Sequence, residues 1–263
     1  MNDFMVDDVH VSVFDSRSAM GRAAAKEAAE LMKHLLEQRS GLRMVFAAAP
    51  SQDEFLDALV EEQGIDWRRI TAFHMDEYIG LPTAAPQRFA HYLDRRLFLR
   101  VPFAAVHRID GAAADPGSEA VRYGTLLCEQ PIDIVCMGIG ENGHIAFNDP
   151  PVANFTDPET VKSVELDDAC RQQQVNDGCF DSVELVPTHA LTLTVPALLG
   201  AASLFIMVPG ERKARAVKRA LYGDISTDCP ASILRRHHHA RLYLDPHSAS
   251  ALPPLTNTTT GLS

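Results

Sequence analysis

Short apolar runs alternate with longer segments of helical period along most of the chain. Residues 18–39 place apolar side chains on one helical face, and residues 42–49 then form a compact apolar run that suits a strand buried on both sides. The order repeats, with helix-like segments at 52–63, 87–99 and 118–129 before strand-like runs at 70–73, 105–109 and 132–137. This repetition predicts an α/β fold with a doubly wound, mostly parallel sheet.

The length of 263 residues and the hydrophobic content of 46% suit one full core, so we expect a single domain over residues 1–248. The remaining elements of this domain are strand-like runs at 9–14, 190–195, 204–208 and 240–244 and a basic helix at 211–221. The polar, weakly periodic stretch at about 150–186 predicts an excursion from the sheet, either a lid or a plain surface insertion. The Pro-, Thr- and Ser-rich tail, 249–263, is expected to be disordered.

The charge balance and the cysteines indicate which kinds of ligand and which cellular compartment suit this chain. There are 24 Lys and Arg against 35 Asp and Glu, and a formal charge of -11 disfavours broad contact with nucleic acid or a membrane surface. Five widely spaced cysteines without a CxxC pair are typical of free thiols and do not indicate a metal site. Neither a signal-like leader nor a run of about eighteen apolar residues is present, so we expect a cytoplasmic protein.

Two adjacent carboxylates, Asp76 and Glu77, follow the strand-like run at 70–73. In doubly wound sheets, ligands bind beyond the carboxyl ends of the strands. A partly desolvated carboxylate there has a raised pKa and can act as a general base. The alternative is that one or both acids are solvated loop residues.

A glycine-rich loop follows the strand-like run at 132–137. Its Gly138, Gly140 and Gly143 allow backbone N–H groups to approach an anion closely. The spacing is not a dinucleotide fingerprint, because Gly143 leads directly into His144 and Pro150 soon interrupts. Set between Asn142 and Asp149, His144 is the candidate proton carrier, although a lone histidine is more often structural.

A phosphate site is expected where the strand-like run at 204–208 meets the basic helix. Lys213 lies near the start of that helix, whose N–H groups face the same edge. Most of its basic residues suit a solvated helix face. Ser51, after the run at 42–49, could reach the same phosphate or act only as a helix cap.

Two segments resemble the signatures of glucosamine-6-phosphate deaminases. They are F-H-M-D-E-Y-I-G-L at 73–81 and G-I-G-E-N-G-H-I-A-F-N-D-P at 138–150. V-P-T-H-A-L-T-L-T at 186–194 and P-G-E-R-K-A at 209–214 follow in the family's order, so the resemblance spans about 42–244. It implies a Rossmann-like fold and conversion of glucosamine 6-phosphate and water to fructose 6-phosphate and ammonia, without a cofactor or metal.

The resemblance also implies roles for single residues. Asp76 would be the base that moves a proton between C2 and C1, and His144, oriented by Asp149, would assist opening of the sugar ring. Glu77 would shape the pocket. Lys213 with Ser51 would hold the phosphate.

Some positions depart from the family pattern. Ala49-Pro50-Ser51-Gln52 stands where G-G-T-P or G-S-T-P is usual, and Asn142 and Asp149 replace frequent acids of the loop. The family's lid element T-R-x-A-N-S-R-F-F is replaced at 169–176, where Arg171 is the candidate substitute for its phosphate-binding arginine. The basic and hydroxyl residues of an activator site are not evident at 157–165, so we expect no such control.

These departures keep other functions open. The substrate could be galactosamine 6-phosphate or 6-phosphogluconolactone, although the segment at 73–81 argues against a lactonase. A non-catalytic sugar-phosphate sensor is a third possibility. A sugar phosphate is the expected partner, and a homo-oligomer is possible.

Overall fold

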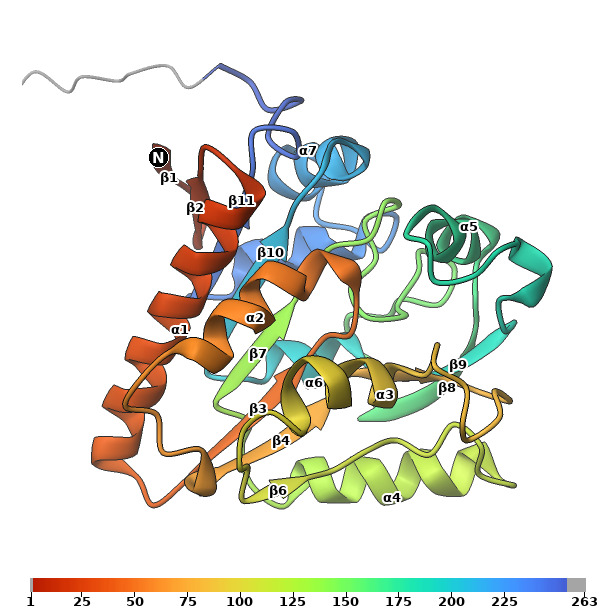
Figure 1. The fold of residues 1–263 in the computed structure, drawn as a ribbon. Helices are drawn as coiled ribbons and strands as arrows, with labels where there is room; N and C mark the ends of the chain where they lie inside the picture. Colours follow the sequence, from red (N-terminus) through yellow and green to blue (C-terminus); the bar gives the residue numbers. More distant parts are fainter. Residues whose placement is uncertain (1, 255–263) are drawn as a thin grey trace, which may run out of the picture.

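A computed structural model describes residues 2–254. An eight-stranded sheet in the order β1-β2-β11-β10-β7-β3-β4-β6 forms its centre (Figure 1). The strands are β1 Asn2–Val6, β2 Val9–Val13, β3 Leu42–Phe46, β4 Ile70–His74, β6 Ala105–Val106, β7 Ile134–Met137, β10 Ser203–Val208 and β11 Ala240–Leu244. All neighbours pair in parallel except β1 and β2. The predicted doubly wound, mostly parallel α/β sheet of Rossmann-like type is confirmed.

Helices cover both faces of this sheet. The helices α1 Arg17–Gln38, α2 Asp53–Glu61 and α3 Phe89–Leu93 contribute to one hydrophobic core, and α4 Pro116–Cys128, α6 Val195–Leu199 and α7 Ala214–Tyr222 contribute to the other. Successive side chains of a strand point to opposite faces. In β3, Val45 therefore joins one core while Met44 and Phe46 join the other.

The order of the strands reverses between β3 and β7. Strands β4 and β6 lie beyond β3, whereas β10 and β11 lie beyond β7. In open α/β sheets, a crevice forms outside the carboxyl ends of the strands at such a switch point. The segments after Phe46 and Met137, which the sequence marked as chemically unusual, therefore meet at one place.

A second, three-stranded sheet stands beside the first, and the sequence did not predict it. It has the order β5-β9-β8, with β5 Asp76–Tyr78, β9 His189–Leu193 and β8 Val161–Glu165, all antiparallel. The stretch at 150–186 is thus not only an excursion, because it supplies β8 and the helix α5 Asp168–Asn176. Figure 1 shows α5 on the side of the molecule that carries this small sheet.

Both ends of the described chain differ from the prediction. Strand β1 was not anticipated. Turns continue through residue 252, and Ala249 and Leu252 pack against the core, so the expected disorder does not begin at residue 249. The rest of the predicted disordered tail, 255–263, lies outside the described residues.

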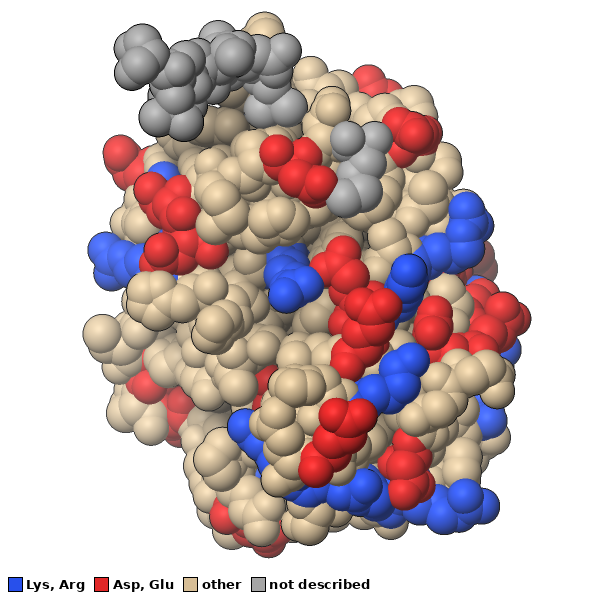
Figure 2. All heavy atoms as spheres, turned by 90° about the vertical axis from the view of Figure 1, so that its left-hand side faces the viewer, with Lys and Arg blue, Asp and Glu red and all other residues tan. Residues whose placement is uncertain are grey.

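Charges of both signs are interspersed on the face drawn in Figure 2, the side on which α1 lies in Figure 1. That face therefore carries no broad basic field of the kind that nucleic acid or anionic lipid would favour. Among the helices of residues 2–254, none combines the length and the apolar character needed to cross a bilayer.

Candidate active site

One pocket lies at the switch point, and five of the residues predicted from the sequence line it. They are Ser51, Asp76, Gly140, His144 and Lys213. Four separate segments supply them: the turn after β3, strand β5, the loop after β7 and the turn after β10. The predicted convergence of an acid, an imidazole and an ammonium group is therefore present.

Asp76 is held in strand β5, which pairs with β9 opposite Thr192. Its side chain is only 7% exposed and borders the pocket. Burial raises the pKa of Asp76 well above its usual value, and the neighbouring Glu77 carboxylate raises it further. A carboxyl group in this state binds a proton more tightly than a solvated aspartate does.

His74 fixes the backbone beneath Asp76. Its Nε2 accepts a hydrogen bond from the N–H of Ile109 at 2.8 Å, so its Nδ1–H can donate to the carbonyl oxygen of Asp76, also at 2.8 Å. Burial lowers the pKa of His74 to about 3, which keeps this ring neutral. Sequence reasoning did not single out this histidine, although it stands only two residues before Asp76.

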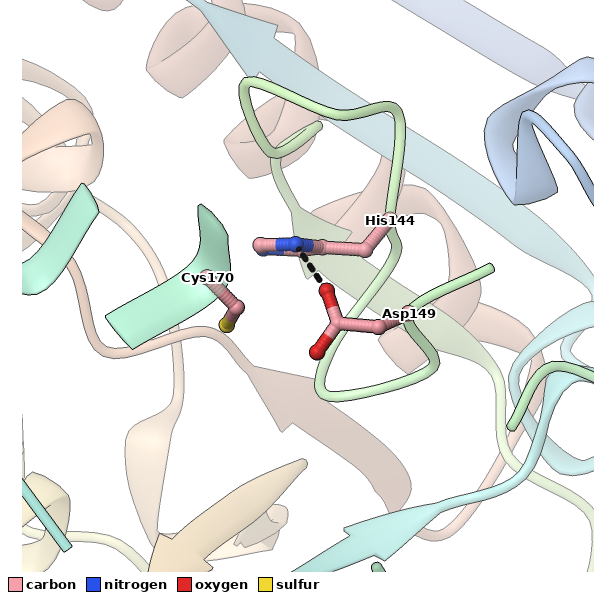
Figure 3. A group of neighbouring side chains, drawn as sticks. All are labelled: His144, Asp149 and Cys170. Atoms are coloured by element: carbon pink, nitrogen blue, oxygen red, sulfur yellow. Dashed lines mark ion pairs between the residues drawn. The ribbon is translucent and has the colours of Figure 1, made fainter. Parts of the chain in front are cut away.

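His144 is coupled to Asp149 and Asn142 within the glycine-rich loop. Its Nδ1 lies 2.8 Å from Oδ1 of Asp149, and its backbone N–H donates to Oδ1 of Asn142 at 2.9 Å. The amide of Asn142 in turn donates to Asp149 at 2.9 Å. Figure 3 shows the carboxylate of Asp149 directed at the His144 ring.

The pKa of Asp149 is lowered overall. Its burial alone would raise that pKa, but the charge and hydrogen bond of His144, with contributions from Asn142 and Cys170, outweigh the burial. An ionised carboxylate at this place can orient the imidazole. Asn142 and Asp149 thus lie behind the histidine and do not line the pocket.

Two glycines give the loop its shape. A Cβ on Gly140 would lie 2.2 Å from Nε2 of His144, so the imidazole can occupy its position only against a glycine. Gly143 has φ +94°, a left-handed conformation that favours glycine, and a Cβ there would lie 2.6 Å from Sγ of Cys229. Gly140 borders the pocket, whereas Gly143 turns the chain behind it.

Lys213 enters the pocket from the short turn Glu211–Lys213 that precedes α7. The side chain is buried, and no hydrogen bond or ion pair with another residue of the described chain occupies its Nζ. Burial lowers the pKa of Lys213, while Asp177 and Glu141 partly oppose that effect. An ammonium group without a direct partner suits an anionic ligand.

Besides Gly143, two predicted binding residues, Glu77 and Arg171, do not reach the pocket. Glu77 accepts hydrogen bonds from the backbone N–H groups of Tyr78, Phe89 and Ala90, so it caps the start of α3. Arg171 donates to the carbonyl oxygens of residues 183 and 186 at 2.7 and 3.1 Å. Its guanidinium group therefore stabilises the segment that follows α5. Arg171 does not lie beside the other site residues.

Helix α5 supplies two pocket residues that sequence reasoning did not select, Gln173 and Gln174. Gln173 accepts a hydrogen bond from the backbone N–H of Glu141 at 2.8 Å. The unusual run of three glutamines at 172–174 was the available signal, but sequence does not show which side of a short polar helix faces inward. Phe89 and Phe147, stacked with their ring centroids 5.6 Å apart, form an aromatic wall.

An ion-pair cluster ties α5 to the rest of the site. Arg212 lies 3.1 Å from Glu141 in the glycine-rich loop and 3.2 Å from Asp177 at the end of α5. It also donates to the backbone oxygen of Asn176 at 3.0 Å. We call these three side chains, Arg212, Glu141 and Asp177, the clasp.

Comparisons with known proteins identify the family of this chain. The sequence model of the family described as glucosamine-6-phosphate isomerases/6-phosphogluconolactonase matches residues 15–244. A glucosamine-6-phosphate deaminase of Listeria monocytogenes is 36% identical over 205 residues, which cover 78% of this chain and 86% of the relative. One of Bacillus cereus is 34% identical over 193 residues, covering 73% and 72%.

Solved structures extend the comparison. A monomeric glucosamine-6-phosphate deaminase superimposes with a TM-score of 0.83 at 28% identity and covers 92% of this chain and 99% of its own. A 6-phosphogluconolactonase from Shewanella baltica gives 0.75 at 17% identity with the same coverage, and this second likeness concerns the fold alone. The resemblance noted in the sequence is confirmed: the chain belongs to the family of glucosamine-6-phosphate isomerases and 6-phosphogluconolactonases.

Proposed function

We propose that this chain converts glucosamine 6-phosphate and water to fructose 6-phosphate and ammonia. The observation that carries the proposal is the convergence of Asp76, His144 and Lys213 on one pocket at the switch point of the sheet. The deaminase relatives named above match over most of the chain and favour this reaction over lactone hydrolysis. The roles below follow from the geometry and from the chemistry of the substrate.

His144 acts first, on the closed sugar ring. A proton that moves between the imidazole and the ring oxygen opens the hemiacetal and exposes the C1 aldehyde. Asp149 keeps the ring of His144 in one orientation, with Nδ1 2.8 Å from its carboxylate. Nε2 is then the nitrogen that serves the pocket.

Asp76 acts next, as the base that moves a proton from C2 to C1. The carbon acid is activated by the neighbouring aldehyde, and the proton returns to C1 to give a ketose imine. Water adds to this imine and ammonia leaves, so the atoms balance without an external oxidant or a cofactor. The raised pKa of Asp76 suits a group that must both accept and return the proton.

The phosphate group is held at the opposite end of the pocket, by Lys213 and Ser51. Lys213 supplies the charge, and Ser51 lies in the short turn Pro50–Gln52 at the exit of β3. Gln52 donates to Oγ of Ser51 at 3.1 Å, which leaves the serine hydroxyl proton free for the ligand. The amides of Gln173 and Gln174 border the same space and offer neutral N–H donors in place of the charged donors of a lid arginine.

The test compares turnover of glucosamine 6-phosphate, galactosamine 6-phosphate and 6-phosphogluconolactone by the purified chain without added metal. Ammonia and fructose 6-phosphate should appear in equal amounts from the first substrate, and kcat/KM should be lower for the other two. Asp168→Asn is the matched control, because the side chain of Asp168 is 97% exposed and the chemical change equals that of Asp76→Asn. Faster hydrolysis of the lactone, or binding without any turnover, would refute the proposal.

A further inference from the structure

Three metal-ligating side chains meet behind the pocket, and the proposed reaction uses only two of them. They are His144 and Asp149 of the glycine-rich loop and Cys170 of α5, whose ligand atoms all lie within 4.8 Å of one another. Figure 3 shows the Cys170 thiol and the Asp149 carboxylate on the same side of the His144 ring. Cys170 is 1% exposed, so water does not compete for this space.

Two buried atoms of this group have no hydrogen bond to a nitrogen or oxygen of good geometry among the described residues: Nδ1 of His144, which only faces Oδ1 of Asp149, and Oδ2 of Asp149. Oδ1 of Asp149 receives the hydrogen bond of Asn142 and lies beside His144, whereas no nitrogen or oxygen of the described residues donates to Oδ2, and the remaining interaction of the carboxylate is with the weakly donating Cys170 thiol. Asp149 is fully buried, with 0% of its surface exposed. An oxygen in this position retains a lone pair for a cation, and an unmatched buried carboxylate oxygen is otherwise unfavourable.

We propose that His144, Asp149 and Cys170 form a binding site for a thiophilic divalent cation such as Zn²⁺ or Co²⁺. Imidazole nitrogen, carboxylate oxygen and thiolate sulfur are the ligand types that these ions prefer. The cation displaces the thiol proton, which leaves to solvent, and forms a bond to the sulfur. The thiolate and the carboxylate together supply two negative charges, which balance the charge of the ion.

The geometry needs only a small contraction. A tetrahedral Zn²⁺ ion, with bonds of about 2.0 Å to nitrogen and oxygen and about 2.3 Å to sulfur, holds its ligand atoms roughly 3.3–3.8 Å apart. The three side chains already lie within 4.8 Å, and His144 borders the pocket, which gives the ion a route to them.

The site is inhibitory. An ion on Nδ1 of His144 and on Asp149 removes the contact that orients the imidazole, so ring opening and cation binding exclude each other. Catalysis without a metal, as expected from the sequence, is compatible with this site. Cation binding itself does not depend on which sugar phosphate the pocket accepts.

Titration of the full chain with Co²⁺ tests the proposal, because a cobalt–thiolate bond produces a charge-transfer absorption band. The wild-type chain should develop the band to saturation at one equivalent, and Zn²⁺ should abolish it. Cys128→Ser, which changes an exposed cysteine, should keep the band, and Cys170→Ser should lose it. Far-ultraviolet circular dichroism checks that each variant is folded.

A second variant covers the case in which Cys170→Ser does not fold. Asp149→Asn keeps the thiol and nearly the same shape, so the band should remain but the affinity for Co²⁺ should fall at least about tenfold. A band that persists in Cys170→Ser, or the absence of a saturable band in the wild-type chain, would overturn the proposal. Unchanged affinity in Asp149→Asn would do the same.

Discussion

Asp76 combines two properties that rarely occur together, because it is nearly buried and yet borders a ligand pocket. Burial and the adjacent Glu77 raise its pKa, and the hydrogen bonds of His74 fix its backbone. Such a carboxyl group is unfavourable for folding and useful for proton transfer, which is the usual relation between active-site residues and stability.

Asp76→Asn should therefore abolish proton transfer while it leaves binding nearly intact. The substitution removes the base but hardly changes the volume, so kcat should fall roughly 10²–10⁴-fold and KM should change little. Steady-state kinetics of Asp76→Asn beside Asp168→Asn measure both constants. A parallel loss of binding would show that Asp76 holds the substrate and does not act as the base.

The same substitution should stabilise the fold at neutral pH. Because the folded-state pKa of Asp76 is raised, the folded chain binds a proton more tightly than the unfolded chain does, and stability declines as pH rises from the unfolded toward the folded pKa. An asparagine does not ionise, so the variant does not lose this stability as the pH rises. The Tm of Asp76→Asn should exceed that of the wild-type chain at pH 7, and the difference should shrink below about pH 4, near the usual pKa of a solvated aspartate. Thermal unfolding at the two pH values checks the sign.

Gly140 should be indispensable for the position of His144. Its substitution by alanine places Cβ 2.2 Å from Nε2 and 2.3 Å from Cε1 of the imidazole, so the ring must move. A displacement of about 1 Å can lower kcat roughly 10²-fold. Gly117→Ala is the control, because Gly117 lies in α4 and its added Cβ would come no closer than 3.3 Å to Asp115. Equal activity of the two variants would contradict the role.

At the scale of elements, polar contacts join α5 to the rest of the site, in addition to the packing of Cys170 in the hydrophobic core. Its residue Gln173 accepts a hydrogen bond from the glycine-rich loop, and the clasp joins its end to the turn before α7. Arg212 is 57% exposed in these pairs, so solvent and salt weaken them. The clasp is thus the part of the attachment of α5 that a substitution or added salt weakens most easily.

Arg212→Gln should loosen α5 and raise KM more than it lowers kcat. Exposed ion pairs contribute roughly 0.2–1 kcal/mol each, which corresponds to a rise in KM of about 1.4- to fivefold for each pair that is lost. Increased salt should reproduce part of this effect in the wild-type chain. Arg215→Gln, which changes an exposed arginine of α7 outside the clasp, should leave KM unchanged. If both variants have the same KM, α5 does not depend on the clasp.

The elements that carry the site could largely be predicted from the sequence, because their periodicity is long and clear. The helix expected at 18–39 is Arg17–Gln38, and that expected at 118–129 is Pro116–Cys128. The small sheet was missed because β5 has only three residues, and because β8 has the sequence V-K-S-V-E, whose polar positions give no apolar run or regular alternation. The direction of Arg171 depends on how α5 packs, and sequence spacing does not contain that information.

At the scale of the whole molecule, the switch point explains why distant segments meet. Parallel strands end at the same edge of a sheet, so Ser51, His144 and Lys213 could be assigned to one site from their places after three strands. Asp76 fits the same rule in sequence, and the structure adds that it lies in β5 of the second sheet. The acid thus stands between two sheets, which accounts for its burial.

The most direct test of this account is a crystal structure of Asp76→Asn with glucosamine 6-phosphate bound, since the variant should bind the sugar without turnover. The account predicts the phosphate within hydrogen-bonding distance of Nζ of Lys213, C2 of the sugar facing residue 76 and the ring oxygen facing His144. A sugar phosphate bound elsewhere, or one whose phosphate lies away from Lys213 with C2 remote from residue 76, would contradict it.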